Sequence, residues 1–179
     1  MELKGSKTEQ NLWTAFAGES QARNKYTFYA SQADKEGFKQ MAAIFLETAD
    51  NEKEHAKMLY KLLMGGAVPP TEENLLAAAD GENEEHTSMY PEFERVAREE
   101  GFDKIADILK EIAEVEEEHE KRYRKLLANL KDKSVFKKDK SVKWKCRNCG
   151  YVHEGTEAPD ECPACAHPQS YYEVLAENY

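Results

Sequence analysis

The sequence predicts an all-α protein of four long helices, followed by a small domain that depends on a bound metal. Three observations predict this fold class. Four amphipathic segments are separated by glycine-containing breaks, the first 130 residues contain an internal repeat, and all four cysteines lie within residues 146–165. A chain of 179 residues has room for one to two domains, which agrees with a helical body and a short metal-held segment.

The helical segments show apolar residues at steps of three and four, and the first three end at glycines. We expect helices over residues 8–35, 38–64, 75–100 and 102–130. Pro91 should bend or interrupt the third helix, because proline removes a backbone donor. Helices of this length, at ~1.5 Å per residue, reach roughly 40 Å. Joined by mostly short loops, they predict a four-helix bundle over residues 1–130.

The internal repeat makes each half of this body a helical hairpin with the same motifs. Glu36-Gly37-Phe38 matches Glu100-Gly101-Phe102 at an offset of 64, and the same offset places Glu52-x-x-His55 on Glu116-x-x-His119. Further upstream, Gly18-Glu19 matches Gly81-Glu82 at an offset of 63. The one-residue slip falls between these motifs, and Pro91 is a plausible place for it.

Polar residues replace apolar ones halfway along each helical stripe. The carboxylates and imidazoles concerned are Glu19, Glu52, His55, Glu82, Glu85, Glu116 and His119. Burying an ion costs several kcal/mol even after relaxation, and a whole domain has only about 5–15 kcal/mol of net stability. Five carboxylates at mid-core therefore require cations, and more than one.

The ligand types narrow the choice of metal. Carboxylate oxygens with two imidazoles suit iron or manganese better than a thiolate-type zinc site. One Glu from each of two helices and a Glu-x-x-His pair from each of the others is the pattern of di-iron bundles. A lone Glu-x-x-His in so acidic a chain would indicate only a solvated helix face. Two such pairs in register favour the two-metal interpretation.

Glu85 breaks the symmetry of the repeat, since the equivalent position in the first half is Ala22. A surplus carboxylate could let one metal change partners between oxidation states, or it could act as an acid beside the metals. Tyr26 and Tyr90 lie near enough on their helices to donate hydrogen bonds to the carboxylates, or they could be plain core residues. His86 lacks a Glu three residues before it, and we expect it on a solvated helix face. We expect His153 and His167 to be surface or loop residues.

The cysteines follow the pattern Cys146-x-x-Cys149, twelve residues, Cys162-x-x-Cys165. This spacing is typical of a tetrathiolate site that holds a single zinc or iron ion. Gly150 suits the tight turn after the first pair. Ala166 stands at the equivalent place after the second pair, where a positive φ would carry a penalty. The segment 142–179 is too short to fold readily without a metal, and we expect residues 131–141 to be a linker.

The net charge of −10 excludes some partners and belongs entirely to the helical body. Residues 131–179 hold 8 basic and 8 acidic residues, so residues 1–130 hold the other 17 and 27. An acidic body argues against nucleic-acid binding, which needs a basic face. No apolar run is long enough to span a membrane, and because the first ten residues lack an apolar stretch we expect no secretion signal. Clustered cysteines without such a signal indicate metal binding in the cytoplasm.

Taken together, the motifs resemble those of the rubrerythrin family across essentially the whole chain. The matching stretches are FAGES (16–20), the two Glu-x-x-His pairs, GENEEHTSMYPEF (81–93), CRNCGYVHEG (146–155) and CPACAHP (162–168). The resemblance implies a ferritin-like bundle with an oxo- and carboxylate-bridged non-haem di-iron centre. It also implies a rubredoxin-like domain, with short strands and cysteine knuckles, that holds one iron. The implied activity is that of a peroxidase that reduces hydrogen peroxide to water and protects against oxidative stress.

The resemblance also implies a role for each site residue. Glu52 and Glu116 would bridge the irons, and Glu19 would bind one iron. Glu82 and His119 would bind the other iron. His55 and Glu85 would alternate on the first iron between its reduced and oxidised states. Tyr26 and Tyr90 would stand beside the ligands as donors.

The family further implies electron delivery from an NAD(P)H-dependent reductase or a rubredoxin. It implies a homodimer or higher oligomer, in which electrons pass between subunits. One departure stands out: the cysteine spacing is tighter than in a free-standing rubredoxin, and Ala166 replaces the usual glycine.

Two other functions fit parts of the sequence. A ferroxidase that oxidises Fe(II) for storage would need only the helical body, and its four-cysteine domain would be a structural zinc ribbon. A binding module built on a zinc ribbon would leave the buried carboxylates unexplained. The presence of two independent metal motifs favours the peroxidase over both.

Overall fold

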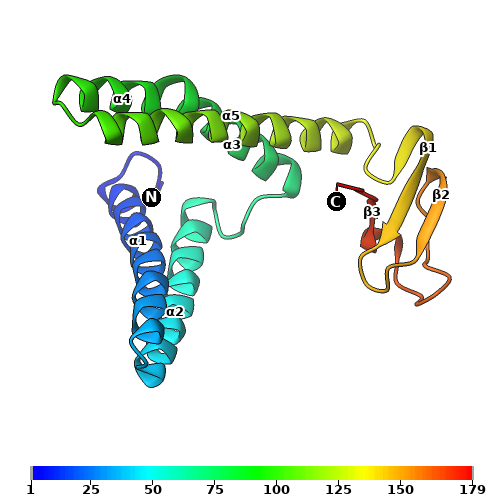
Figure 1. The fold of residues 1–179 in the computed structure, drawn as a ribbon, viewed down its shortest axis with the longest axis horizontal. Coiled ribbons are helices and arrows are strands. Elements are labelled where there is room, and N and C mark those ends of the chain that lie inside the picture. Colours follow the sequence, from blue (N-terminus) through cyan, green and yellow to red (C-terminus); the bar gives the residue numbers. More distant parts are fainter. Residues whose placement is uncertain (1, 179) are drawn as a thin grey trace. The chain divides into compact units, whose positions relative to one another are not determined.

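The computed structural model describes residues 2–178. The chain forms two compact units, 1–69 and 70–179. The first unit is a hairpin of two antiparallel helices, α1 (Lys7–Lys35) and α2 (Lys39–Leu63). The second contains the helices α3 (Thr71–Glu84), α4 (Tyr90–Glu99) and α5 (Asp103–Lys131) and a small sheet. The helices that the periodicity predicts are thus confirmed to within a few residues (Figure 1). None of the described helices is long and apolar enough to cross a membrane.

The two hairpins turn in the same way, which confirms the internal repeat at the level of structure. After α1, Gly37 has φ 87°, and the amide of Phe38 donates to the carbonyl of Ala33 at 2.8 Å. After α4, Gly101 has φ 83°, and the amide of Phe102 donates to the carbonyl of Ala97 at 2.8 Å. A positive φ is cheap only for glycine, so both helices end at this residue.

The third helical segment is interrupted by a π-helical turn, η1 (Glu85–Met89), between α3 and α4. The amide of Tyr90 donates to the carbonyl of Glu85, five residues back, and Pro91 follows at the start of α4. A π turn accommodates one extra residue in a helix and is frequent at functional sites. It lies between Glu82 and Gly101, so it accounts for the one-residue slip in the repeat.

Alanines form the contact between the helices of each hairpin. Ala30, Ala33, Ala42 and Ala49 are buried in the first unit, and Ala79, Ala97 and Ala106 are buried in the second. Side chains this small let helix backbones approach closely. Larger apolar residues such as Ile44, Met58, Ile105 and Ile108 stay more than half exposed within their own units. Each hairpin therefore has an apolar face that requires a partner, as expected of one half of a four-helix bundle.

The sheet is antiparallel, with strand order β2–β1–β3. Its strands are β1 (Lys137–Cys146), β2 (Val152–Glu157) and β3 (Tyr172–Val174), and a 3₁₀ turn (Gln169–Tyr171) precedes β3. Residues 137–141, expected to be linker, belong to β1, so that part of the expectation is wrong. Their pairing with β2 shifts register between Lys137 and Val142, which hides the strand pattern in the sequence. The proposed boundary between a helical and a metal-held domain stays a prediction.

Candidate metal centres

The two Glu-x-x-His pairs adopt the same geometry in the two hairpins. In α2, Nδ1 of His55 lies 2.8 Å from Oε2 of Glu52. In α5, Nδ1 of His119 lies 2.6 Å from Oε2 of Glu116. A spacing of three residues places both side chains on one helix face, and the repeat carries this arrangement into both units.

A third carboxylate completes each group from the neighbouring helix. Glu19 of α1 joins Glu52 and His55, and we call these residues the first acidic group. Glu82 of α3 joins Glu116 and His119, and we call these the second acidic group. Within each group, one ligand atom from each residue lies within 4.8 Å of the others. Each group therefore offers three donor atoms from two helices to a cation.

Burial and neighbouring carboxylates together raise the pKa of one carboxyl in each acidic group. Burial raises the pKa of Glu19, and the hydrogen bond and negative charge of Glu52 raise it further. Burial likewise raises the pKa of Glu82, and the charge of Glu116 adds to this effect while His119 opposes it. Carboxylates that repel one another and resist ionisation gain most when a metal supplies the missing positive charge.

The remaining predicted residues of the helical body lie beside these groups. The pKa of Tyr90 is raised by burial first and then by the charges of Glu85, Glu116 and Glu82, so Tyr90 faces the second acidic group. Glu85 opens the π turn and acts electrostatically on Glu82, but it is not one of the three clustered residues. Tyr26 packs its ring against Tyr29 and Phe45, 6.1 and 6.3 Å away between centroids, which fits a core role.

The prediction that His86 lies on a solvated helix face is wrong. Its Nε2 lies 2.7 Å from Oε2 of Glu120 in α5, and both side chains are only 16% exposed. The amide of Asn83 donates to the same carboxylate at 3.1 Å, and Nε of Arg124 donates to its other oxygen at 3.0 Å. Arg124 in turn contacts Asp80 at 2.9 Å. We call these contacts the polar ladder. The ladder joins α3 and η1 to α5, next in sequence to the second acidic group.

The ladder predicts an acid-sensitive contribution to stability. Hydrogen bonds from His86 and Asn83 hold the pKa of Glu120 well below its ordinary value of 4.5, at about 2. A depressed folded-state pKa stabilises the protein fully above the unfolded value, and this contribution is lost as pH falls from about 4.5 towards 2. We expect Glu120→Gln to lower the urea midpoint of the metal-free protein at pH 7 but to have little effect near pH 2. Glu118→Gln, on an exposed side chain of the same helix, is the control, and equal pH slopes in the two variants would contradict this prediction.

The four cysteines converge at one point of the sheet domain. Sγ of Cys146 lies 3.8 Å from Sγ of Cys165, and Sγ of Cys149 lies 3.6 Å from Sγ of Cys162. These separations are far too long for disulfides. Four sulfurs at about 2.3 Å from a tetrahedral ion would lie about 3.8 Å apart. The arrangement therefore fits a single tetrathiolate metal.

Two matching turns present the sulfurs. The amide of Gly150 donates to the carbonyl of Cys146 at 2.9 Å, and the amide of Ala166 donates to the carbonyl of Cys162 at 2.8 Å. Gly150 has φ 81° and Ala166 has φ 55°. Ala166 is therefore confirmed as the equivalent of Gly150 and has a positive φ. An alanine in this conformation costs roughly 1–2 kcal/mol.

The local electrostatics act in opposite directions on Cys165 and Cys149. The backbone amide of His167 lowers the pKa of Cys165 to about 6, against the effect of burial. The amide of Tyr151 lowers the pKa of Cys149, but hydrogen bonds with the other cysteines and burial raise it to about 12. The cysteines thus share protons that a metal ion would displace. His167 lies in a loop, as expected, and its ring packs edge-on against Tyr171 with centroids 4.4 Å apart.

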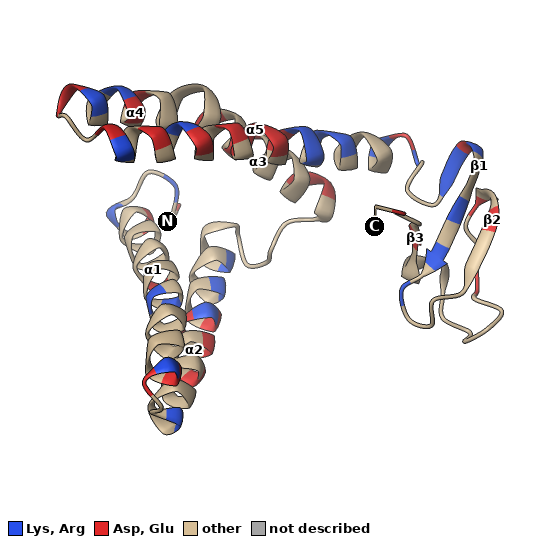
Figure 2. Cartoon of the chain, viewed as in Figure 1, with Lys and Arg blue, Asp and Glu red and all other residues tan. Residues whose placement is uncertain are grey.

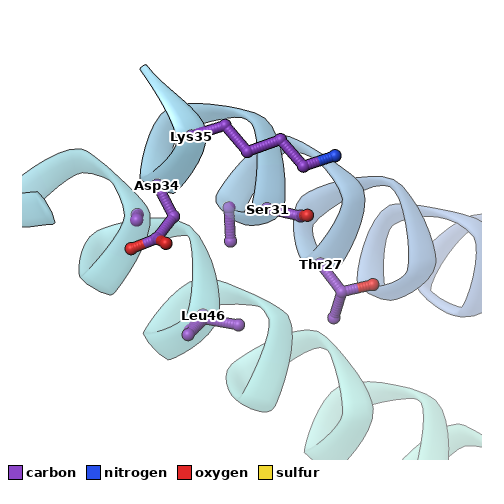
Figure 3. Close-up of a pocket in the computed structure, with 7 residues that line it drawn as sticks. Thr27, Ser31, Asp34, Lys35 and Leu46 are labelled. Atoms are coloured by element: carbon purple, nitrogen blue, oxygen red, sulfur yellow. The ribbon is translucent and has the colours of Figure 1, made fainter. Parts of the chain in front are cut away.

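A surface hollow of the first hairpin does not coincide with the first acidic group. One hollow of about 350 Å³ at the turn end of the first hairpin is lined by Thr27, Ala30, Ser31, Asp34, Lys35, Ala42 and Leu46 (Figure 3). Its lining includes none of the first acidic group, and Asp34 is already paired with Lys39 at 2.6 Å. The centres are recognised by their donor groups. Acidic and basic side chains alternate along α5, the helix that contains Glu116 and His119 (Figure 2).

Fold and donor sets define a helical metalloprotein with carboxylate–histidine groups and a separate tetrathiolate site. Comparison with protein families matches residues 10–127 to rubrerythrin and residues 144–173 to the rubrerythrin rubredoxin-like domain. Rubrerythrin of Nitratidesulfovibrio vulgaris is 53% identical over 99% of this chain and 98% of its own. Rubrerythrin of Porphyromonas gingivalis is 54% identical over 99% of this chain and 94% of its own. The chain belongs to the rubrerythrin family.

Membership confirms the fold class expected from the sequence, a ferritin-like helical body with a rubredoxin-like domain. It also confirms the cofactor class: a non-haem di-iron site, for which the carboxylate–histidine groups are suited, and a rubredoxin-type site, for which the cysteines are suited. The protein is therefore an iron protein of the oxidoreductase type related to oxidative stress.

Proposed function

We propose that the protein is a peroxidase that reduces hydrogen peroxide to water, with electrons that enter through the four-cysteine site. The observation that carries this proposal is the presence in one chain of two carboxylate–histidine groups and a tetrathiolate group. A storage-type ferroxidase has no use for a one-electron carrier, whereas a peroxidase must be reduced again after each turnover. Family membership supports the same assignment.

In this proposal the seven predicted ligands hold two irons. Glu19, Glu52 and His55 come from the first acidic group, Glu82, Glu116 and His119 from the second, and Glu85 is the surplus ligand. The irons, when bound, supply Lewis acidity and one electron each for cleavage of the O–O bond. The chain's part is to position the ions, to shield them from water and to supply protons.

Reduction of one peroxide to two waters consumes two electrons and two protons. Tyr90 is suited to hold a proton beside the second acidic group, because burial and three carboxylate charges keep its hydroxyl protonated. Glu85 stands one helical turn before Tyr90, at the start of the π turn. We propose that these two residues deliver protons to the reacting oxygen atoms, and that Tyr26 has the corresponding place in the first hairpin.

The electrons are proposed to come from an NAD(P)H-dependent reductase or a rubredoxin. Backbone amides that point at the sulfurs, such as that of His167 at Cys165, stabilise the extra negative charge of a reduced tetrathiolate iron. The proposal includes a homodimer or larger homo-oligomer, in which the electron passes from the four-cysteine site of one subunit to the di-iron site of another.

The test is to reduce the iron-loaded protein without oxygen and to mix it rapidly with stoichiometric peroxide or, separately, with oxygen. The visible absorbance of the tetrathiolate iron and of the di-iron site is followed in each case. The peroxidase proposal expects fast oxidation of both sites by peroxide and slow oxidation by oxygen. A colourless four-cysteine site, or a di-iron site that prefers oxygen, would instead support a ferroxidase with structural zinc.

The proposed role of Glu85 as the surplus ligand can be tested by substitution. We expect Glu85→Ala to slow peroxide turnover by about 10–100-fold, the usual loss when a residue that supports a metal site is removed. The visible spectrum of the tetrathiolate iron should not change. Glu84→Ala is the matched control, because Glu84 precedes Glu85 in the chain but is exposed. Turnover of Glu85→Ala equal to that of the control would remove Glu85 from the mechanism.

A further inference from the structure

Tyr172 places a buried hydroxyl beside the four-cysteine site. It is the first residue of β3, it pairs with Cys146 of β1, and it is only 4% exposed. Its ring belongs to the core cluster that contains Trp144, Cys146 and Cys162. Among the described residues, its hydroxyl is the buried side-chain oxygen or nitrogen without a hydrogen-bond partner. Such a group destabilises a folded protein, and its presence calls for an explanation.

The candidate partner within this cluster is the sulfur of Cys162, which is 1% exposed. Burial raises the pKa of Cys162, but interaction with the Tyr172 hydroxyl and with the amides of Ala164 and Cys165 turns the net shift downwards. Burial also raises the pKa of Tyr172, and the interaction with Cys162 raises it further. A tyrosine hydroxyl has an ordinary pKa of about 10 and keeps its proton at neutral pH, so it can only donate to a thiolate.

We propose that Tyr172 donates a hydrogen bond to the Cys162 thiolate of the iron-loaded site and thereby raises the reduction potential of that iron. A donor draws electron density from sulfur, and the reduced site, with four thiolates on Fe(II), bears one more negative charge than the oxidised site. The hydrogen bond is therefore stronger in the reduced state. The unsatisfied hydroxyl is explained as a group whose partner is the metal-bound thiolate.

The consequence is that a single side-chain oxygen adjusts the reduction potential of the iron in the four-cysteine site. A higher potential favours uptake of the electron from a donor and reduces the driving force for passing it on. This inference rests on iron in the four-cysteine site and on no part of the peroxidase proposal. A potential is measured without peroxide or turnover, so failure of one is distinguishable from failure of the other.

The test is the midpoint potential of iron-loaded, full-length Tyr172→Phe, which keeps the ring and removes the hydroxyl. At an ambient potential equal to the wild-type midpoint, the ratio of reduced to oxidised iron should fall on the order of tenfold, or about 59 mV for one electron. The thiolate-to-iron absorption bands should shift as well. Tyr171→Phe is the control, because Tyr171 is the neighbouring residue, is 40% exposed and packs on His167. A midpoint in Tyr172→Phe equal to that of the control would overturn the proposal.

A second variant guards against misfolding of the first. Fluorotyrosine at position 172 keeps the ring and the hydroxyl but makes the phenol a stronger donor, so the midpoint should move in the opposite direction, towards higher potential. An unchanged or lowered midpoint with fluorotyrosine would show that Tyr172 fills the core without acting on the iron.

Discussion

Replacing Glu116 by glutamine is expected to abolish stable iron binding at the carboxylate–histidine groups and to slow peroxide reduction by at least about 100-fold. Glu116 contacts His119 at 2.6 Å and acts on Glu82 through both charge and a hydrogen bond. It is therefore the residue that joins the second acidic group. An amide keeps the size and one acceptor oxygen but removes the charge that an iron ion requires. Loss of a supporting residue typically costs 10–100-fold, and loss of a direct ligand should cost more.

The same variant should make the metal-free protein more stable rather than less. Burial is the main cause of the raised pKa of Glu82, and the negative charge of Glu116 raises it further, so the two carboxylates repel each other in the absence of a metal. Glutamine removes this repulsion. We therefore expect the thermal midpoint of the apo-protein to rise at pH 7 and the gain in thermal midpoint on adding Fe(II) to disappear. A residue with a purely structural role would shift both midpoints downwards.

Glu117→Gln is the matched control, since Glu117 is adjacent, about half exposed and paired with Lys121 at 2.8 Å. It should bind iron and turn over peroxide as the wild type does. Iron content by elemental analysis and turnover by peroxide consumption are the two measurements. Retention of the di-iron absorbance in Glu116→Gln would exclude Glu116 as a ligand.

The periodicity of the sequence predicted the helices and the repeat predicted the Glu-x-x-His geometry, because both depend on local spacing. A separation of three residues places Glu52 beside His55 in any helix. The repeat then predicts the same pair at Glu116 and His119, and the structure places them at 2.8 and 2.6 Å. The cysteine spacing predicted a convergent site for the same reason, and the sulfurs lie 3.6 to 3.8 Å apart.

The contacts missed from the sequence connect residues far apart in the chain. Glu120 and His86 are separated by 34 positions, and no spacing rule relates them. The Glu-x-x-His motif drew attention to His119, whereas the adjacent Glu120 looked like one more surface acid. Tyr172 was missed in the same way, because its burial depends on pairing with Cys146 across the sheet. A one-residue slip between the repeats was visible, but the π turn that absorbs it was not.

The four-cysteine domain is expected to unfold when its metal is removed, while the helices persist. Its buried core consists of Trp144, Cys146, Ala158, Cys162 and Tyr172, so two of its five members are themselves predicted metal ligands. A core this small cannot offset the entropy lost on folding. Binding of a structural metal to four cysteines contributes on the order of 10 kcal/mol in small domains, and that energy is folding energy.

Trp144 reports this transition directly. It is fully buried, and its Nε1 donates to the carbonyl of Gly155 at 3.0 Å, so unfolding of the sheet should shift its emission maximum to longer wavelength. The other tryptophan, Trp13, is 43% exposed in α1, and Trp13→Phe leaves Trp144 as the single reporter. Comparing zinc-loaded with metal-free protein under reducing conditions avoids quenching by iron and disulfide formation. Helical circular dichroism should change little, because the helices contain none of the cysteines. A Trp144 emission maximum that stays in place after metal removal would show that the sheet folds without the ion, and the four cysteines would then hold a redox centre that the fold does not need.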